Sequence, residues 1–150
     1  MRKIIFTRPD GGVTVVYPVI NITEISAGFT EADAEQRAWD KLPVDAINPV
    51  FVDESAIPTD RTFRNAWEHS GNSVTQNITK AKTIAHEKRR EARAEEFAPH
   101  DEVIMKQIPG ADATAAESAR ATIRTKYATM QTAINAASTV DAIKSAMPQG

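Results

Sequence analysis

The hydrophobic and polar positions of residues 77–98 repeat with the period of an α-helix. Apolar residues recur every three or four positions, and charges of opposite sign stand three positions apart on the remaining surface. The apolar stripe consists of Ile78, Ala81, Ile84, Ala85, Ala92 and Phe97. Because this stripe is rich in alanine, and each buried methylene contributes only about 0.8 kcal/mol, the helix needs a partner helix or another chain.

A second helical pattern begins at Thr114, where Glu117 follows at the spacing of a capping box. Its apolar stripe is continuous and suits the stripe of the first helix, so we expect the two to form an antiparallel hairpin. The stripe consists of Ala116, Ala119, Ile123, Tyr127, Met130, Ile134 and Ala137. Thr139 then predicts the cap of a last short helix over residues 140–147.

Prolines mark the ends of these helices. Pro99 predicts a stop or a kink in the first helix, because its ring removes a hydrogen-bond donor and crowds the preceding turn; residues 101–107 can continue the helix for two more turns. Residues 108–112 then predict a break before the second helix.

The first half of the chain shows short β-branched runs instead. Residues 3–7 and 13–17 flank a Pro-Asp-Gly-Gly sequence, which predicts a β-hairpin. Thr30 predicts the cap of a helix that runs to about Lys41, and residues 50–52 predict a third strand beside the hairpin. The result is a ββαβ arrangement.

A second, small hairpin is predicted after the third strand. Its strands are expected at residues 62–67 and at Val74-Thr75, with the turn at residues 69–72. Phe63 and Trp67 lie four positions apart on one strand face, so we expect them to pack inward. Residues 19–29 show no pattern that decides between helix, strand and loop.

These patterns predict an α+β fold with two parts. Residues 1–76 form a β-rich lobe that contains one helix, and residues 77–150 form the helical hairpin with its short terminal helix.

The composition is that of a globular protein, with 41% hydrophobic and 25% charged residues. The formal net charge of -2 and pI of about 5.9 give no overall basic field to attract nucleic acid or an acidic membrane. The chain contains no cysteine, which excludes thiol catalysis, disulfides and cysteine-ligated zinc. No run approaches the ~18 consecutive apolar residues that a membrane-spanning helix needs. We also expect that the residues following Met1 do not form a signal peptide.

The sequence holds no pattern typical of catalysis or metal binding. His86 and Glu87 resemble half of a zinc-binding helix, but Arg90 stands where the second histidine belongs, and it would repel a cation. Asp53 and Glu54 are adjacent in an extended run, so their carboxylates point to opposite faces. We therefore expect no enzymatic activity, no cofactor, no metal and no small-molecule substrate.

Two basic segments could contact a partner. Arg61 and Arg64 flank Phe63, and basic residues interleaved with aromatic ones can bind nucleic acid, although packing of an edge strand explains the same pattern. In the first long helix, interleaved acidic residues cancel much of the basic charge. The candidate interface residues are Arg61, Phe63, Arg64, Trp67, Ile84, Lys88 and Arg89. The edge of the first hairpin is a further candidate, for strand addition.

Residues 1–12 and 45–67 resemble a family of small proteins encoded in the late, structural gene clusters of tailed bacteriophages and prophages. Residues 79–94 resemble a segment of that family that also recurs near the ends of some tail-fibre and tail-fibre-assembly proteins, and residues 139–148 resemble the family's terminal helix.

The resemblance implies a structural protein of the virion, in the tail or at the attachment point of the tail fibres. Its partners would be other phage structural proteins and copies of itself. Its location would be the virion, and the host cytoplasm during assembly. The alternative is a tail-fibre assembly chaperone that is absent from the mature particle.

Overall fold

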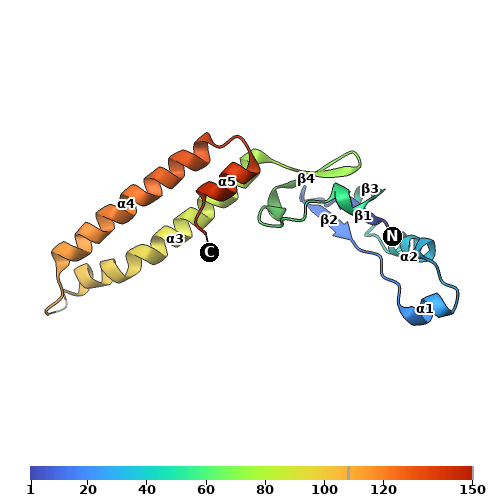
Figure 1. Cartoon of the computed structure of the whole chain (residues 1–150), viewed down its shortest axis with the longest axis horizontal. Helices are drawn as coiled ribbons and strands as arrows, with labels where there is room; N and C mark the ends of the chain where they lie inside the picture. The colour runs from blue at the N-terminus through green and yellow to red at the C-terminus, as the bar shows by residue number, and fades with distance from the viewer. Residues whose placement is uncertain (108, 150) are drawn as a thin grey trace. The chain divides into compact units, whose positions relative to one another are not determined.

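The structure is a computed structural model that describes residues 1–107 and 109–149. The α+β class predicted from the sequence is confirmed: antiparallel strands come first in the chain, and two long helices that pack against each other follow (Figure 1). The chain forms two compact units, Met1–Asn77 and Ile78–Gly150.

Strands β1 (Lys3–Thr7) and β2 (Val13–Val16) form the predicted first hairpin. The backbone N–H of Arg8 donates to the carbonyl of Gly12 at 2.7 Å, and the Asp10 carboxylate accepts the N–H of Gly12 at 2.8 Å. Gly11 supplies the positive φ, +82°, that this turn requires. The turn residues therefore close the hairpin by local hydrogen bonds.

Strand β3 (Ile47–Val52) pairs antiparallel with β1, so the sheet order is β2-β1-β3 and the predicted position beside the hairpin is confirmed. The strand begins earlier than the predicted residues 50–52 and includes Asn48 and Pro49. These two residues lie inside β3, where the register shifts opposite the stretch between Ile5 and Thr7, and Asn48 has a φ of +51°. The proline is tolerated because β3 is an edge strand with a bulge.

Helix α2 (Glu31–Asp40) begins at the predicted cap. The backbone N–H of Asp33 donates to the Thr30 hydroxyl at 3.2 Å, and the Asp33 carboxylate accepts the N–H of Thr30 at 2.8 Å. Trp39 stacks on Phe51 of β3 with ring centroids 4.8 Å apart, and Ala34 is buried. Helix α2 thus covers the β3 side of one sheet face.

The second hairpin exists, but its first strand was predicted too early. Residues 62–66 are not a strand, because they include a 3-10 turn, η2 (Arg64–Ala66). Strand β4 (Trp67–Ser70) pairs with β5 (Ser73–Gln76), and the turn is the shorter Gly71-Asn72. A further 3-10 turn, η1 (Glu54–Ala56), follows β3. The core under the sheet contains Ile5, Val13, Val52, Ile57, Trp67 and Val74.

Residues 19–29, which the sequence left undecided, contain a short helix, α1 (Ile22–Ser26). None of the residues of α1 is buried. This segment connects β2 to α2.

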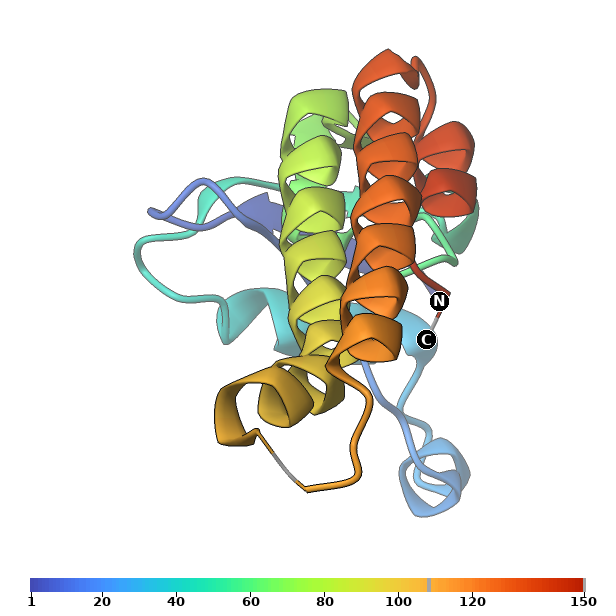
Figure 2. The same cartoon turned by 90° about the vertical axis from the view of Figure 1, so that its left-hand side faces the viewer.

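The second unit is a helical hairpin of α3 (Ile78–Lys106) and α4 (Ala113–Ala136), which lie side by side (Figure 2). The predicted antiparallel arrangement is confirmed, because Lys82 contacts Asn135 near one end and Glu96 contacts Tyr127 farther along. The predicted stripes pack inward. Their buried members are Ala81, Ala85, Ala116, Ile123, Tyr127, Ile134 and Ala137.

Helix α3 runs through Pro99, where the sequence predicted a stop or a kink, and Figure 2 shows its last turns deviating from the line of the earlier ones. The capping box predicted at Thr114 and Glu117 is wrong. The cap of α4 is Asp112, whose carboxylate accepts the N–H groups of Thr114 and Ala115 at 2.9 and 3.2 Å. Glu117 pairs instead with arginines of its own helix.

The terminal helix α5 (Val140–Ala146) begins at its predicted cap, Thr139. It packs on both long helices with Ile143 fully buried. In the part of the chain that the structure describes, no helix is both long and apolar enough to cross a membrane.

Candidate docking surface

Helix α1 is only five residues long, too short to be stable from propensity alone, and it is capped at both ends. At its start the Asn21 side chain accepts the N–H of Glu24 at 2.9 Å, and the Glu24 carboxylate accepts the N–H of Asn21 at 3.0 Å. At its end the N–H of Gly28 donates to Ile25 and that of Phe29 donates to Glu24. Gly28 has a φ of +85°, so the helix closes with a Schellman motif.

Arg37 of α2 fixes this segment to the rest of the unit. Its Nη1 lies 2.5 Å from Glu24 Oε1, its Nη2 donates to the carbonyl of Val19 at 2.5 Å, and its guanidinium carbon lies 4.9 Å from the centre of the Phe29 ring. The Arg37 guanidinium and the Asn21 N–H hold the pKa of Glu24 below its ordinary value. We call these contacts the Arg37 clamp.

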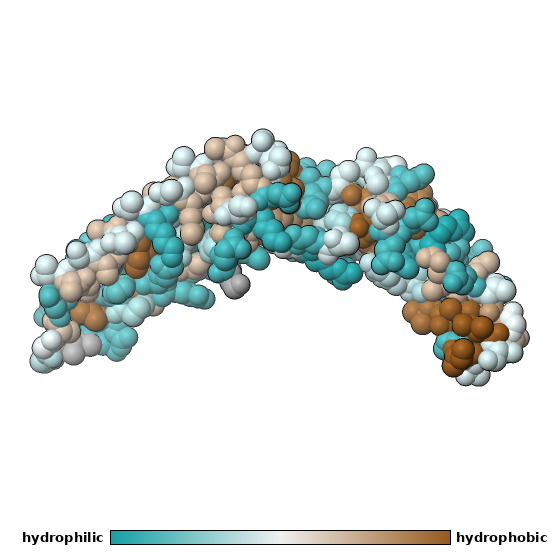
Figure 3. All heavy atoms as spheres, viewed as in Figure 1, coloured by the Kyte–Doolittle hydropathy of each residue, from teal (hydrophilic) through white to brown (hydrophobic). Residues whose placement is uncertain are grey.

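The clamp holds apolar side chains in solvent. Val19, Ile22 and Ile25 are 69%, 75% and 51% exposed, and Tyr17 at the end of β2 is 41% exposed. In Figure 3 hydrophobic residues gather over this end of the unit. We call Tyr17, Val19, Ile22 and Ile25 the α1 apolar patch. The fold does not bury these side chains, although burial would remove them favourably from water.

A groove of about 480 Å³ adjoins the patch. It arises because α2 covers the β3 side of the sheet and leaves the β2 side of the same face open. Phe6, Thr14 and Val16 form its floor, and Ala38 and Leu42 line it from the side of α2. Tyr17 and Val19 belong both to the groove and to the patch. We call it the β2 groove. Its charged lining residues are Arg37 and Lys41.

The predicted interface residues of the first unit divide into two pairs. Arg61 and Arg64 are exposed, and Arg61 donates to the Tyr17 hydroxyl at 3.2 Å, which places it beside the α1 apolar patch. Phe63 and Trp67 are only 1% and 2% exposed. They pack inward, as the spacing suggested, and therefore offer no surface to a partner.

The predicted interface residues of α3 differ in their exposure. Lys88 is exposed, whereas Ile84 and Arg89 are half-buried. Arg89 approaches the backbone carbonyl of Tyr127 at 3.5 Å, and burial lowers the pKa of its guanidinium, with Arg90 adding to the effect. Arg89 thus belongs partly to the contact between α3 and α4.

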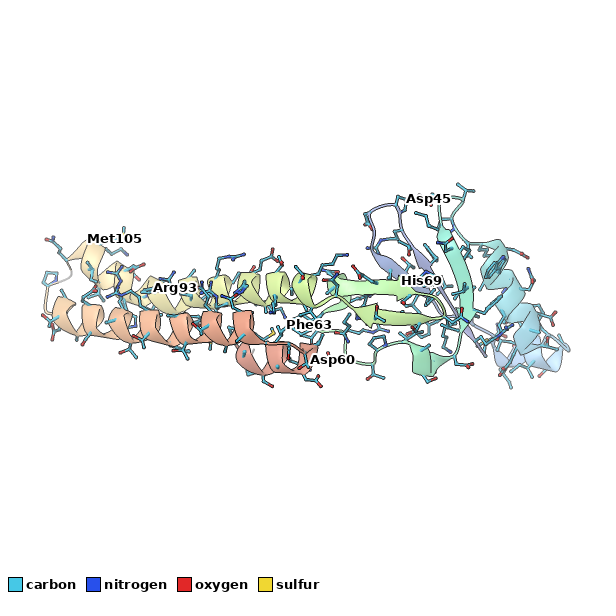
Figure 4. All side chains as sticks on the ribbon, turned by 90° about the horizontal axis from the view of Figure 1, so that it is seen from above. Asp45, Asp60, Phe63, His69, Arg93 and Met105 are labelled. Atoms are coloured by element: carbon cyan, nitrogen blue, oxygen red, sulfur yellow. The ribbon has the colours of Figure 1, made fainter. Side chains whose placement is uncertain are left out.

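A basic hollow lies farther along the helical hairpin, near Arg93, which Figure 4 labels on α3. Its positive charge is partly cancelled: Arg120 pairs with Asp101 at 2.9 Å, and Glu117 pairs with both Arg120 and Arg124. Arg93 stacks over Phe97 at 4.9 Å. Surface pairs of this kind contribute little to stability, and they leave a weak field for a polyanion.

Two of the three histidines make structural hydrogen bonds. His69 bonds the carbonyl of Gly71 at 2.7 Å, and His86 bonds the side chain of Asn135 at 2.9 Å. Within the described residues, no group of three His, Cys, Asp or Glu side chains gathers to hold a metal ion. The α1 apolar patch and the β2 groove therefore form the candidate functional site.

Sequence reasoning missed this surface, although part of its signal is present. Asn21 and Glu24 have the capping-box spacing, and Gly28 stands where a helix end needs a positive φ. The exposure of Ile22 and the contact of Arg37 with Val19 depend on the tertiary structure, and no local pattern reveals them. Comparison of the chain with family models, with curated proteins and with solved structures finds no match.

Proposed function

We propose that this chain is an assembly protein that binds other protein chains through the α1 apolar patch and the β2 groove. The observation that carries the proposal is the Arg37 clamp, which holds Val19, Ile22 and Ile25 in solvent on a segment capped at both ends. Contiguous exposed apolar side chains of this kind mark interaction surfaces in soluble proteins. A rigid display reduces the conformational entropy lost on binding.

A protein partner suits the surface better than a small molecule. The β2 groove is apolar, and Arg37, one of its two charged lining residues, is already paired with Glu24. Small-molecule sites combine an apolar enclosure with several convergent polar groups that fix the orientation of the ligand. We therefore assign the chain no enzymatic step and no cofactor.

We propose further that the assembly is a tailed-bacteriophage virion, in which the chain belongs to the tail or to the attachment point of the fibres. The resemblance of residues 1–12 and 45–67 to phage structural proteins supports this part of the proposal. The protein would then occur in the virion, and in the host cytoplasm while particles form. A tail-fibre assembly chaperone is the alternative, because it too would bind proteins through an apolar surface.

Quantitative mass spectrometry of purified particles tests the proposal. A structural protein is present in a fixed ratio to the tail proteins. A chaperone is absent from mature particles but co-purifies with the fibre protein from infected cells. Absence from both preparations would overturn the proposed function.

A further inference from the structure

The α1 apolar patch and the β2 groove are complementary surfaces on one unit. The patch protrudes with Ile22 and Ile25, and the groove beside it is hollow and apolar, with Tyr17 and Val19 common to both. The Arg37 clamp and the Schellman motif at Gly28 hold α1 outside its own groove. A chain that carries both an apolar protrusion and an apolar hollow can satisfy them with a second copy of itself.

We propose that a second copy of this chain is the partner, and that each copy inserts α1 into the β2 groove of the other about a two-fold axis. The proposal rests on the proposed function, because it names the partner of the same surface. In such an isologous contact Ile22 of one copy meets Ala38 and Leu42 of the other, and the reverse contact forms at the same time.

The charges on this surface permit two copies to approach. Glu24 and Arg37 neutralise each other within one chain, so α1 brings no unpaired charge into the opposite groove. Lys41 lines the groove, where its aliphatic stem can lie against a docked isoleucine while its ammonium stays in water.

The size of the surface predicts a weak dimer. The groove lining together with Ile22 and Ile25 provides fewer residues than the roughly 20–30 per partner of a standard interface. We expect a Kd on the order of 10–100 µM for the free protein. A repeated assembly raises the local concentration of copies, so a contact of this strength can hold within a particle.

Sedimentation equilibrium of the full chain, from about 1 µM to about 500 µM, tests the inference. Ile22→Asp removes the protrusion and Ala38→Glu blocks the groove, and we expect each change to weaken dimerisation at least tenfold. Met105→Asp is the matched control, because Met105 is 81% exposed on α3 of the other unit (Figure 4), and we expect it to leave dimerisation unchanged.

Mixing the two variants distinguishes a reciprocal contact from non-specific association. A mixture of Ile22→Asp and Ala38→Glu chains keeps one intact protrusion facing one intact groove. We expect this mixture to form a heterodimer at concentrations where each variant alone is monomeric. Equal weakness of the mixture and of the separate variants would contradict the reciprocal arrangement.

Cysteine cross-linking provides a second measurement that does not depend on the folding of Ala38→Glu. The chain contains no cysteine, so Ile22→Cys and Leu42→Cys introduce single thiols. On air oxidation with a copper catalyst we expect a mixed disulfide between these two variants. A mixture of Met105→Cys and Leu42→Cys should remain uncross-linked.

The outcomes separate this inference from the proposed function. A wild-type chain that is monomeric over the whole range, with no Ile22–Leu42 cross-link, overturns the two-fold contact. If such a chain is still found in particles, its partner is a different protein and the proposed function stands. A dimer that forms as expected from a chain absent from both particles and fibre complexes supports the contact and overturns the function.

Discussion

Two isoleucine-to-alanine substitutions in the same unit should differ greatly in their effect on stability. Ile5 is fully buried in the core beside Trp67, whereas Ile22 is three-quarters exposed on α1. Each substitution removes three carbon atoms, worth about 2.4 kcal/mol when all are buried. At Ile5 the cavity adds to this loss, so we expect a destabilisation of about 3–4 kcal/mol.

At Ile22 the substitution loses only about a quarter of this transfer free energy, roughly 0.6 kcal/mol, because the side chain is three-quarters exposed. Alanine has the higher helix propensity by a few tenths of a kcal/mol, which offsets part of this loss. We therefore expect Ile22→Ala to change the free energy of unfolding by less than about 0.5 kcal/mol. The difference between the free energies of unfolding of the two variants measures how little the Ile22 side chain contributes to the stability of the fold.

Urea denaturation followed by tryptophan fluorescence measures both values. The two tryptophans of the chain, Trp39 and Trp67, lie in the Met1–Asn77 unit, so the signal reports its unfolding. The protein should be kept below about 1 µM, where the expected dimer is dissociated. A loss above about 1 kcal/mol for Ile22→Ala would refute the reasoning, because it would make Ile22 part of the monomer core.

Three further predictions concern the polar contacts. Arg37→Gln should release residues 19–29, so hydrogen exchange at the Phe29 amide should accelerate at least tenfold while the β1 amides keep their rates; equal rates at Phe29 would contradict the clamp. Because Arg37 lowers the pKa of Glu24, residues 19–29 should be fully ordered above pH 4.5. This order should be lost as the pH falls through the lowered pKa that Glu24 has in the folded protein, and NMR chemical shifts can follow the change. Burial and the 2.7 Å bond to Glu96 raise the pKa of Tyr127 from 10.0 to about 12, so its contribution to stability should be complete below pH 10 and lost as the pH rises towards 12; Tyr127→Phe should abolish the late step in a 295 nm absorbance titration.

The elements that the sequence predicted correctly depend on local signals. The Thr30 cap, the Gly11 turn and the isoleucine and tyrosine stripe of α4 are each readable within a few residues, and each forms as expected. Because the α+β class follows from such signals, it too could be predicted.

Where the sequence left alternatives, or gave two competing signals, tertiary and local contacts decide between them. At Pro99, where a stop or a kink was predicted, the helix continues, and the pair of Asp101 with Arg120 of α4 at 2.9 Å helps to keep the last turns helical. Thr114 has a valid capping spacing, yet Asp112 takes the role because its carboxylate reaches two N–H groups.

The candidate site was harder to predict than the fold. Phe63 and Trp67 were candidate contact residues because Arg61 and Arg64 flank Phe63, but both are buried, as their spacing on one strand face predicted. In the sequence, Ile22 and the other apolar residues of the docking surface cannot be distinguished from ordinary hydrophobic core positions. Their exposure follows from the contacts of Arg37 with Glu24 and Val19, which lie 13 and 18 positions away in the chain.

The most direct test of the proposed virion role, and of the surface that would serve it, is the amount of this protein in purified virus particles when its gene carries Ile22→Asp. We predict that incorporation falls by at least about tenfold, the effect expected when an interface loses a central apolar contact. Particles that carry Met105→Asp should contain the normal amount. Normal incorporation of the Ile22→Asp chain would contradict the claim that the α1 apolar patch is the surface through which this protein assembles.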